Sequence, residues 1–458
     1  MDEKRDPARR LNAEAKAKVQ AAADAFNGGR VVEAATIWAE LARTAPADHR
    51  WPGNLAVALR RLGKLDAAIA AFRRALALAP DEPTTLTGLG NALRARGDVE
   101  EAMRVLSRAF VRDPKAAAVR YNLALSLRDG RRLADAGSLL AGLVAEFSDR
   151  ADYRWDLALT RLQLGEYEEG FRDFEARWKL PRNKVRLREG PQWDGGDIDG
   201  QRILLQAEKG IADAILFARY VPLLAQRGAK VAVECAPVLA RLFASLKGVE
   251  QVVQSGTPAP EVDRIAPLLS LPRLFGTQLA TVPAEVPYLT AAAPFELPAT
   301  PGARLKLGLV WAATPAPRDR SWPLPALASF AEIPHVAVFS LQTGPRAHEL
   351  AGGGFDHLVH NLAPRLRSLD DVAAAMQQLD LLITVDTAVA HLAGALGRPT
   401  VLLLRHVADW RWSVGERTDC PWYPTMRVVR QMKADDFATP VEDLRKALTN
   451  MVARDRAR

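Results

Sequence analysis

The chain has only two cysteines, Cys235 and Cys420, which lie far apart and form no CxxC pair. Neither a disulfide framework nor a cysteine zinc site is therefore expected. No apolar run approaches the length that crosses a membrane, and the first residues, MDEKRDPARRLNAEAKAK, lack the apolar core of a signal peptide. These absences predict a cytoplasmic protein with no membrane span.

The chain also lacks a block of Lys and Arg or an aromatic RNA-binding signature, although its net charge is +8. Residues 1–190 hold 34 Lys and Arg against 27 Asp and Glu, or +7, and the remaining residues hold 28 against 27, or +1. Because both signs are mixed along the expected helices, no nucleic-acid partner is predicted. The basic excess indicates a solvated helical surface or a preference for an acidic protein partner.

The first 180 residues carry an internal repeat of 34 residues, the spacing between Pro46, Pro80 and Pro114 (80−46 and 114−80). Other residues recur in the same register: Gly29, Gly63 and Gly97; Ala34, Ala68 and Ala102; Trp38, Phe72 and Leu106. A glycine between helices, a small residue where helices touch and a proline at the turn are typical of tetratricopeptide repeats. The register predicts about five helix pairs that bury their apolar faces by stacking. Such a solenoid binds a protein segment or, alternatively, is a rigid spacer or dimerisation arm.

The rest of the chain alternates between short apolar runs and helical patterns, which predicts parallel, doubly wound sheets. Seven segments are expected as strands: ILLQAE, KVAVEC and EQVVQSG, then LKLGLVW, AVFSLQ, LLITV and TVLLL. A last helix is expected from about residue 441 to 452. With 458 residues, 48% of them hydrophobic, the chain is long enough for several such cores.

Changes in composition divide the chain into four expected parts. Residues 1–180 form the repeat domain, and residues 181–200, rich in Pro, Gly and charge, form a linker. A first lobe covers residues 201–296 and a second lobe covers residues 297–458. The predicted fold class is an α-solenoid followed by two doubly wound α/β lobes.

The segment DLLITVDTAVAHLAGALGRP (380–399) joins a buried strand to a helix. Asp386 and Thr387 stand between them, at the carboxyl end of the strand and the amino end of the helix. Open α/β sheets bind ligands there, and the helix N-terminus favours an anion. His391 is expected either to face that site or to be a packed core residue, and the alternative role for Asp386 or Thr387 is that of a helix cap only.

Several segments resemble the GT-B glycosyltransferases related to bacterial heptosyltransferases, known as glycosyltransferase family nine. They are EARWKL (175–180), PQWDGGDIDGQRILLQAEKGIADAILFARY (191–220), LLSLPRLFGT (268–277), LGLVWAATP (307–315), FSLQTGP (339–345), ITVDTAVAHLAGALGRPT (383–400), DWRW (409–412) and PWYPTMRVVRQ (421–431). The whole chain is similar to bacterial proteins that join tetratricopeptide repeats to such a domain, among them flagellin-modifying glycosyltransferases. The resemblance implies a GT-B fold, with the first lobe on the acceptor side and the second on the nucleotide-sugar side.

The same resemblance implies a set of donor-binding residues. They are Arg320 in DRSWP, Gln342 in FSLQTGP, and Asp386, Thr387, Ala388 and His391 in DTAVAH. Ala388 departs from the family, which has glycine there. Leaving-group phosphates would be stabilised without a metal or other cofactor, by a helix N-terminus and by the planar guanidinium of Arg320.

The general base implied by the resemblance is Asp213, in EKGIADAI, which would take a proton from the acceptor hydroxyl. Ala212 precedes it where relatives have glycine, and Lys209 stands where glutamine is common, so this match is imperfect. Glu208 is the reserve candidate, and a capping role in the first helical turn is the alternative for Asp213. Trp410, Trp412, Trp422 and Tyr423 are interpreted mainly as core, with stacking on a nucleobase as the alternative.

Three functions remain open from the sequence. The first is a metal-independent, inverting glycosyltransferase that moves a sugar from a nucleotide sugar to a protein acceptor, for example flagellin, held by the repeats. The second is a non-catalytic adaptor with a degenerate GT-B domain, suggested by Ala212 and the altered WAATPAPRD loop. The third is a heptosyltransferase-like enzyme acting on a glycolipid, which the repeats disfavour. The nucleotide, the sugar, the acceptor and the oligomeric state are not specified.

Overall fold

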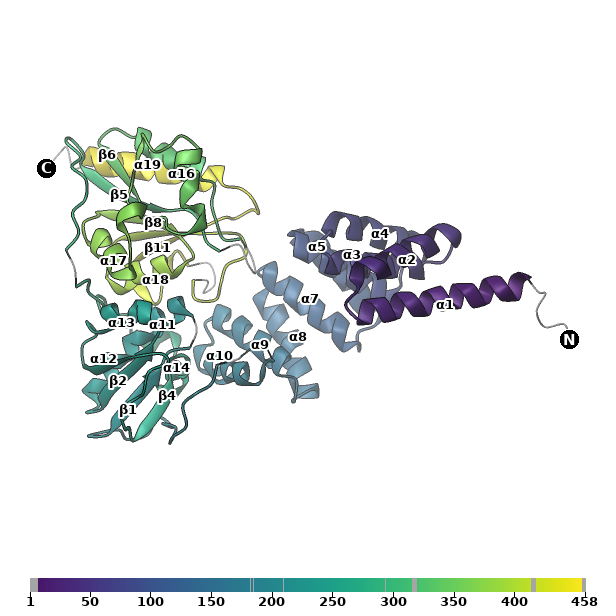
Figure 1. Cartoon of the computed structure of the whole chain (residues 1–458), viewed down its shortest axis with the longest axis horizontal. Coiled ribbons are helices and arrows are strands. Elements are labelled where there is room, and N and C mark those ends of the chain that lie inside the picture. The colour runs from purple at the N-terminus through teal and green to yellow at the C-terminus, as the bar shows by residue number, and fades with distance from the viewer. Residues whose placement is uncertain are drawn as a thin grey trace. The chain divides into compact units, whose positions relative to one another are not determined.

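The computed structural model describes residues 7–181, 183, 185–208, 210–292, 294–314, 319–412 and 417–454. The chain divides into two compact units, residues 1–160 and 161–458. The first is a helical array and the second contains two separate sheets with helices around them (Figure 1). The expected class, an α-solenoid followed by α/β lobes, is confirmed.

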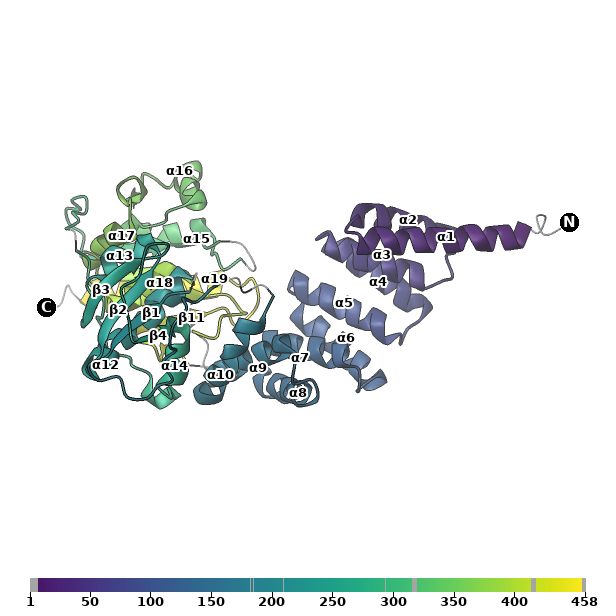
Figure 2. The ribbon, with the colours of Figure 1, turned by 60° about the horizontal axis from the view of Figure 1, so that its bottom comes forward.

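The described part of the first unit consists of antiparallel helices, of which the first is the longest. They are α1 (Pro7–Asn27), α2 (Val31–Thr44), α3 (Arg50–Arg61), α4 (Leu65–Leu78), α5 (Pro83–Arg96), α6 (Val99–Arg112), α7 (Ala117–Asp129), α8 (Leu133–Glu146) and the start of α9 (Ala151–Leu164). From α1 to α8 each helix packs against the next one along the chain, and Figure 2 shows this succession for α5 to α8.

The turns inside the helix pairs explain the glycines of the repeat. Gly29, Gly63, Gly97 and Gly165 all have positive φ, at 81°, 75°, 106° and 85°. This left-handed conformation costs a residue with a Cβ, but not glycine. The equivalent position of the fourth pair (97 + 34) is occupied by Arg131, which takes the same conformation with φ 63°.

The small and large residues of the repeat meet in the core as expected. The small ones, Ala34, Ala68, Ala102 and Ala136, are fully buried, and so, within a few per cent, are Trp38, Phe72, Leu106 and Leu140. Glycines of α5 make room for two of the large ones. A Cβ on Gly88 would lie 2.5 Å from the Phe72 ring, and one on Gly90 would lie 2.4 Å from Leu106 Cγ.

The first sheet of the second unit has four parallel strands in the order β3-β2-β1-β4. The strands are β1 (Arg202–Gln206), β2 (Lys230–Cys235), β3 (Val249–Gln254) and β4 (Arg264–Pro267). Its helices are α11 (Ile211–Phe217), α12 (Val221–Gln226), α13 (Pro237–Phe243) and the short α14 (Leu271–Leu274). Apart from its first residue, β1 is buried along its length, as a central parallel strand should be.

The second sheet has the order β10-β11-β9-β8-β5-β6-β7, and all pairs are parallel except β10 with β11. Its strands are β5 (Leu305–Val310), β6 (Val336–Ser340), β7 (Val359–Asn361), β8 (Leu381–Val385), β9 (Thr400–Leu404), β10 (Asp419–Cys420) and β11 (Tyr423–Arg430). All seven predicted strands of the two sheets are present, whereas β4, β7, β10 and β11 were not predicted.

Helices cover this second sheet. They are α15 (Leu324–Ala328), α16 (Glu349–Gly352), α17 (Leu369–Gln377), α18 (Ala388–Ala395) and α19 (Ala438–Arg454). The expected last helix is thus confirmed as α19, which buries Val441, Leu444, Leu448 and Val452 in the core of this lobe. None of the helices in the described parts of the chain is long and apolar enough to cross a lipid bilayer.

The two sheets of the second unit are joined by helices that pack across from one to the other. Helix α11 packs on α18, and α13 packs on α17 (Figure 1). The buried Arg219 adds polar contacts, because its Nη1 donates to the carbonyl oxygens of Pro283, at 3.0 Å, and Trp422. The carboxyl ends of β1 and β8 consequently lead into helices that touch.

Helix α10 (Tyr167–Phe174) has the sequence register of a repeat helix but belongs to the core of the second unit. Its Phe171 ring lies 5.7 Å from that of Trp410, 6.4 Å from that of Phe217 and 6.3 Å from that of Trp422. Tyr167 stacks on Trp422 at 5.6 Å. The division between the units therefore falls inside α9, twenty residues before the expected boundary (180−160).

The segment expected as a linker, residues 181–200, is partly built into the first sheet. Gln192 forms a parallel bridge with Ile265 of β4, and the Trp193 N–H donates to the Ile265 carbonyl at 2.9 Å. Trp193 and Ile198 are buried. The prolines, glycines and charges of this segment indicated a linker, but its Trp193 packs against Phe275 of the lobe that follows.

We expect Phe171→Ala to lower the free energy of unfolding of the second unit by about 3–5 kcal/mol, because it removes a fully buried aromatic ring. Phe72→Ala is the matched control, since it deletes an equally buried ring in the first unit. Denaturant unfolding followed by tryptophan fluorescence and by helical circular dichroism separates the two units. If Phe171→Ala lowered the free energy of unfolding of the first unit only, α10 would be packed with the repeats instead.

Candidate functional site

The segment 380–399 folds as the sequence predicted, into strand β8, a tight turn, helix α18 and strand β9. Thr387 is the N-cap of α18, and its Oγ1 accepts a hydrogen bond from the Val389 N–H at 3.2 Å. Ala388 is the first residue of the helix. The capping role left open for Thr387 is therefore confirmed.

Asp386 does not cap the helix and is tied instead to two side chains. Its Oδ1 accepts a hydrogen bond from Trp412 Nε1 at 2.8 Å, and its Oδ2 lies 3.3 Å from Arg320 Nη1. Burial raises the pKa of this carboxyl, the charge of Asp409 raises it further, and Arg320 and Trp412 oppose the rise. Asp386 thus holds a guanidinium at the amino end of α18.

His391 is a packed residue of this core, which was one of the two expectations for it. It is 1% exposed, its Nδ1 lies 3.0 Å from Tyr423 Oη, and its ring lies 4.3 Å from that of Trp412. Burial lowers the pKa of His391 well below its ordinary value, and the nearby arginines Arg411, Arg219 and Arg320 lower it further. The imidazole is accordingly neutral in the folded protein.

Arg320 and Gln342 differ in exposure, and therefore in whether a ligand can reach their side chains. The Arg320 side chain is 38% exposed and contacts only the Asp386 carboxylate among the described residues. The Gln342 amide is buried, and its Oε1 accepts from the N–H groups of Trp311 at 3.2 Å and Ala312 at 2.9 Å. Gln342 therefore fixes the chain at the end of β5 and is not brought against Asp386.

Asp213 lies in the first turn of α11, in the half of the unit that carries the first sheet. Its Oδ1 accepts from Nε of Arg411 at 2.8 Å and also from Nη2 of the same guanidinium. Arg411 Nη1 donates in addition to Asp409 Oδ1 at 2.7 Å. Burial lowers the pKa of Arg411, but the two carboxylates outweigh burial and raise it.

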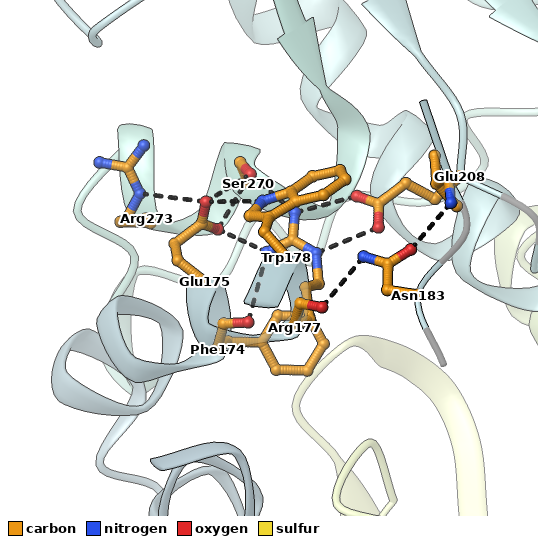
Figure 3. Close-up of polar contacts among 9 residues, drawn as sticks. Phe174, Glu175, Arg177, Trp178, Asn183, Glu208, Ser270 and Arg273 are labelled. Carbon is orange, nitrogen blue, oxygen red and sulfur yellow. Dashed lines mark hydrogen bonds and ion pairs between the residues drawn. The ribbon is translucent and has the colours of Figure 1, made fainter. Parts of the chain in front are cut away.

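Glu208, the reserve base, is paired with a different arginine. Arg177 donates to Glu208 Oε2 through Nε at 3.1 Å and to Oε1 through Nη2 at 2.9 Å, as Figure 3 shows. Burial raises the pKa of Glu208, and Arg177 opposes that rise. Both oxygen atoms of the Glu208 carboxylate accept hydrogen bonds from Arg177. The Oδ2 atom of Asp213, in contrast, accepts no hydrogen bond from the described residues. Asp213 is the better placed of the two to accept a proton.

The two alanines that stand where relatives have glycine cause no backbone strain. Ala212 and Ala388 lie in the first turns of α11 and α18, and neither has a positive φ. A right-handed helical turn accepts any residue with a Cβ. Lys209, the other departure near Asp213, and residues 315–318 of the altered loop lie outside the described residues.

Two arginines of this region had no role in the sequence interpretation. Arg411 belongs to the DWRW segment and links Asp213 to the tryptophan that holds Asp386. Arg219 is buried without an acidic partner in the described chain; it donates to carbonyl oxygens and lies 4.5 Å from the centre of the Tyr423 ring. The only feature of the sequence that could have pointed to these two arginines is that each lies close to aromatic residues, in WRW (410–412) and FARY (217–220).

The aromatic residues of DWRW and PWYP are core residues, as expected. Trp410, Trp412, Trp422 and Tyr423 are all at most 2% exposed. Within the described residues no group of three or more His, Cys, Asp and Glu side chains is arranged to hold a metal ion. The site thus combines guanidinium groups suited to phosphate with a carboxylate, Asp213, suited to a proton.

Comparisons with known proteins agree with this arrangement. A family model described as glycosyltransferase family 9 (heptosyltransferase) matches residues 283–435, and tetratricopeptide-repeat models match residues 13–83 and 59–125. The chain therefore carries tetratricopeptide repeats in its N-terminal part and a glycosyltransferase family 9 domain in its C-terminal part. The family 9 match covers the second sheet, including Arg320, Asp386 and Arg411, and leaves the first sheet outside.

Protein FlbA of Caulobacter vibrioides is 27% identical to this chain over 444 aligned residues, covering 86% of the chain and 72% of that protein. Several solved structures are similar to part of the chain. MamA from Desulfovibrio magneticus RS-1 is 20% identical, with a TM-score of 0.34, covering 38% of this chain and 97% of that one. PilF of Pseudomonas aeruginosa is 18% identical, with a TM-score of 0.34, covering 38% of this chain and 79% of that one.

The neutral, buried His391 predicts a pH dependence of stability. Below the ordinary pKa of 6.5 the unfolded chain takes a proton on this histidine that the folded protein does not. Unfolding is then favoured as the pH falls, by up to about 1.4 kcal/mol per pH unit for one proton. We expect His391→Gln to show a smaller fall in melting temperature between pH 7 and pH 5 than the parent protein. Parallel curves for the two proteins would mean that His391 is protonated in the fold.

Proposed function

We propose that the protein transfers a sugar from a nucleotide-sugar donor to a protein acceptor that is bound by the repeats. The observation that carries this proposal is the chain of contacts from Arg320 through Asp386 and Trp412 to the neighbouring Arg411 and Asp213. It brings a phosphate-binding guanidinium of the family 9 domain and a carboxylate of the first sheet's half to one region. Donor and acceptor chemistry need these two groups together.

The donor diphosphate would bind at the amino end of α18. Arg320 is exposed and its planar guanidinium matches two phosphate oxygens. The helix N-terminus, at Thr387 and Ala388, adds a partial positive charge and free N–H groups. With positive charge from these sources, the departing diphosphate is stabilised without a metal ion.

Asp213 would act as the general base. In one displacement the acceptor oxygen bonds to the anomeric carbon, the bond from that carbon to the diphosphate breaks, and Asp213 takes the hydroxyl proton. Attack from the face opposite the leaving group inverts the anomeric configuration. Asp213 must first be released from Arg411, and a donor phosphate is the anion that we expect to take its place on that guanidinium.

The acceptor is proposed to be a protein because a helical repeat array offers an extended binding surface and no chemistry of its own. Residues 1–190, which include the repeats, carry +7 of the net charge of +8, which favours an acidic acceptor segment. Flagellin is one candidate. A cytoplasmic acceptor of this kind would be modified before its export or assembly.

We expect Arg320→Gln to weaken binding of the donor by about 10- to 150-fold, because losing a hydrogen bond between charged groups costs about 1.5–3 kcal/mol. A panel of nucleoside diphosphate sugars is first tested for thermal stabilisation of the parent protein. Titration calorimetry then gives the affinity of each variant for the sugar nucleotide that stabilises it. Arg417→Gln is the control, since Arg417 forms an exposed ion pair with Asp419 in the same lobe. Equal affinities in both variants would remove Arg320 from the donor site.

We expect Asp213→Asn to abolish transfer without weakening donor binding, because the amide keeps the shape but accepts no proton. Since an uncharged amide competes less with a donor phosphate for Arg411, donor affinity should be equal to that of the parent protein or higher. Transfer is measured with a radiolabelled nucleotide sugar and a cell extract that is afterwards separated into protein and lipid. Glu208→Gln is run in parallel, and loss of transfer in that variant alone would move the role of base to Glu208. Label in lipid alone favours a glycolipid acceptor, and label in neither fraction favours a non-catalytic adaptor.

A further inference from the structure

The first sheet has a topological switch point between β1 and β4. The chain runs from β1 to β2 and β3 on one side and then returns to β4 on the other side of β1. β1 and β4 are therefore adjacent although β2 and β3 lie between them in the chain, and in open α/β sheets ligands bind outside the carboxyl ends of the strands at such a point. In this protein a side chain from the end of the repeat array occupies that position.

The side chain is Arg177, in the 3₁₀ helix η1 (Glu175–Lys179) that follows α10. Its guanidinium bonds twice to Glu208, which follows β1, and its Nη2 also donates to Ser270 Oγ, beyond the end of β4, at 2.8 Å. Its Nη1 donates to Glu175 Oε1 at 2.6 Å. Figure 3 shows the guanidinium at the centre of these partners.

The group is enclosed and nearly balanced in charge. The Arg177 side chain is 5% exposed and that of Glu208 is 8% exposed. The guanidinium carbon lies 4.5 Å from the centre of the Trp178 ring, which covers it. Arg273, at 4.0 Å from Glu175, adds a second positive charge at the rim. A bidentate pair that is this well enclosed fixes the direction as well as the position of the carboxylate.

Glu208 stands two residues after the end of β1 and five residues before Asp213, the proposed base. It is therefore the anchor of the connection that leads from β1 into the first turn of α11. The two carboxylates also act on each other, since the charge of Asp213 contributes to raising the pKa of Glu208. If Glu208 lost its partner, its buried charge would move toward water and carry the connection with it.

We propose that Arg177 is a positioning residue of the transfer reaction. By holding Glu208 it fixes the start of α11, and with it Asp213, from the last element of the repeat array. This inference rests on the proposed function, because it assumes that Asp213 is the base. It assigns to the EARWK segment a part in catalysis without contact with either substrate.

The test uses the full-length protein in three forms. Arg177→Met alone leaves Glu208 buried without a partner and risks misfolding, so the decisive form is Arg177→Met with Glu208→Gln, which removes both charges. Arg177→Lys retains one charge but not the bidentate geometry. Arg273→Gln is the control at the rim of the same cluster.

For the double variant we expect donor affinity and donor KM close to those of the parent protein and a kcat about tenfold to a hundredfold lower, since small displacements of a catalytic group have effects of this size. The kcat of Arg177→Lys should lie between those of the double variant and the parent protein, and the kcat of Arg273→Gln should equal that of the parent protein. A folded double variant with the parent kcat would overturn the proposal and leave Arg177 as a structural contact only.

Amide hydrogen exchange separates this proposal from the proposed function. Faster exchange in residues 210–217 of the double variant, with unchanged exchange around α18, supports positioning by Arg177 even if no transfer is found for the parent protein. That combination would overturn the proposed function alone. Unchanged exchange in residues 210–217 would overturn the positioning role whatever the activity.

Discussion

A guanidinium group that is taken out of water must find acceptors for its N–H groups, and in the second unit this requirement joins segments that are far apart in the chain. Arg177 joins the end of the repeat array to the ends of β1 and β4. Arg219, which follows α11, joins the end of that helix to the loop before β11, and Arg411 joins the start of the same helix to the turn around Asp386. Replacing a whole buried ion pair with apolar residues is often neutral for stability, so the contribution of such pairs lies in fixing one arrangement of the segments they join.

The residues proposed to bind the donor and the residue proposed as the base are held in place by different kinds of contact. Arg320 and Asp386 belong to the turn between β8 and α18, whose backbone is fixed by a buried parallel sheet. Asp213 belongs to a short helix whose start depends on Glu208 and whose carboxylate is held by Arg411. The position of the proposed donor-binding groups is thus determined by strand packing, while the position of the proposed base is determined by ion pairs. Changes in local charge should therefore affect the acceptor side first.

Much of this architecture could be predicted from the sequence, since the features concerned repeat or are continuous. The 34-residue register identified the repeats, and apolar runs identified β1, β5 and β8. Short or mixed strands gave no such signal: β7 has three residues, and β11 alternates between exposed and buried positions. The contact between Asp213 and Arg411 joins residues 198 positions apart, so no local pattern contains it. The resemblance supplied the site residues, but only the packing showed that Gln342 and His391 are buried supports.

The incorporation of α10 into the second unit also bears on how such a protein can change over time. Stacked repeats contact only their neighbours, so whole 34-residue modules can be gained or lost between α1 and α8 with little effect beyond the adjoining pair. The terminal module has no such freedom, because Tyr167 and Phe171 fit against Trp410 and Trp422. The number of helix pairs can therefore vary among α1 to α8 without disturbing α10, which is fixed by its packing in the second unit.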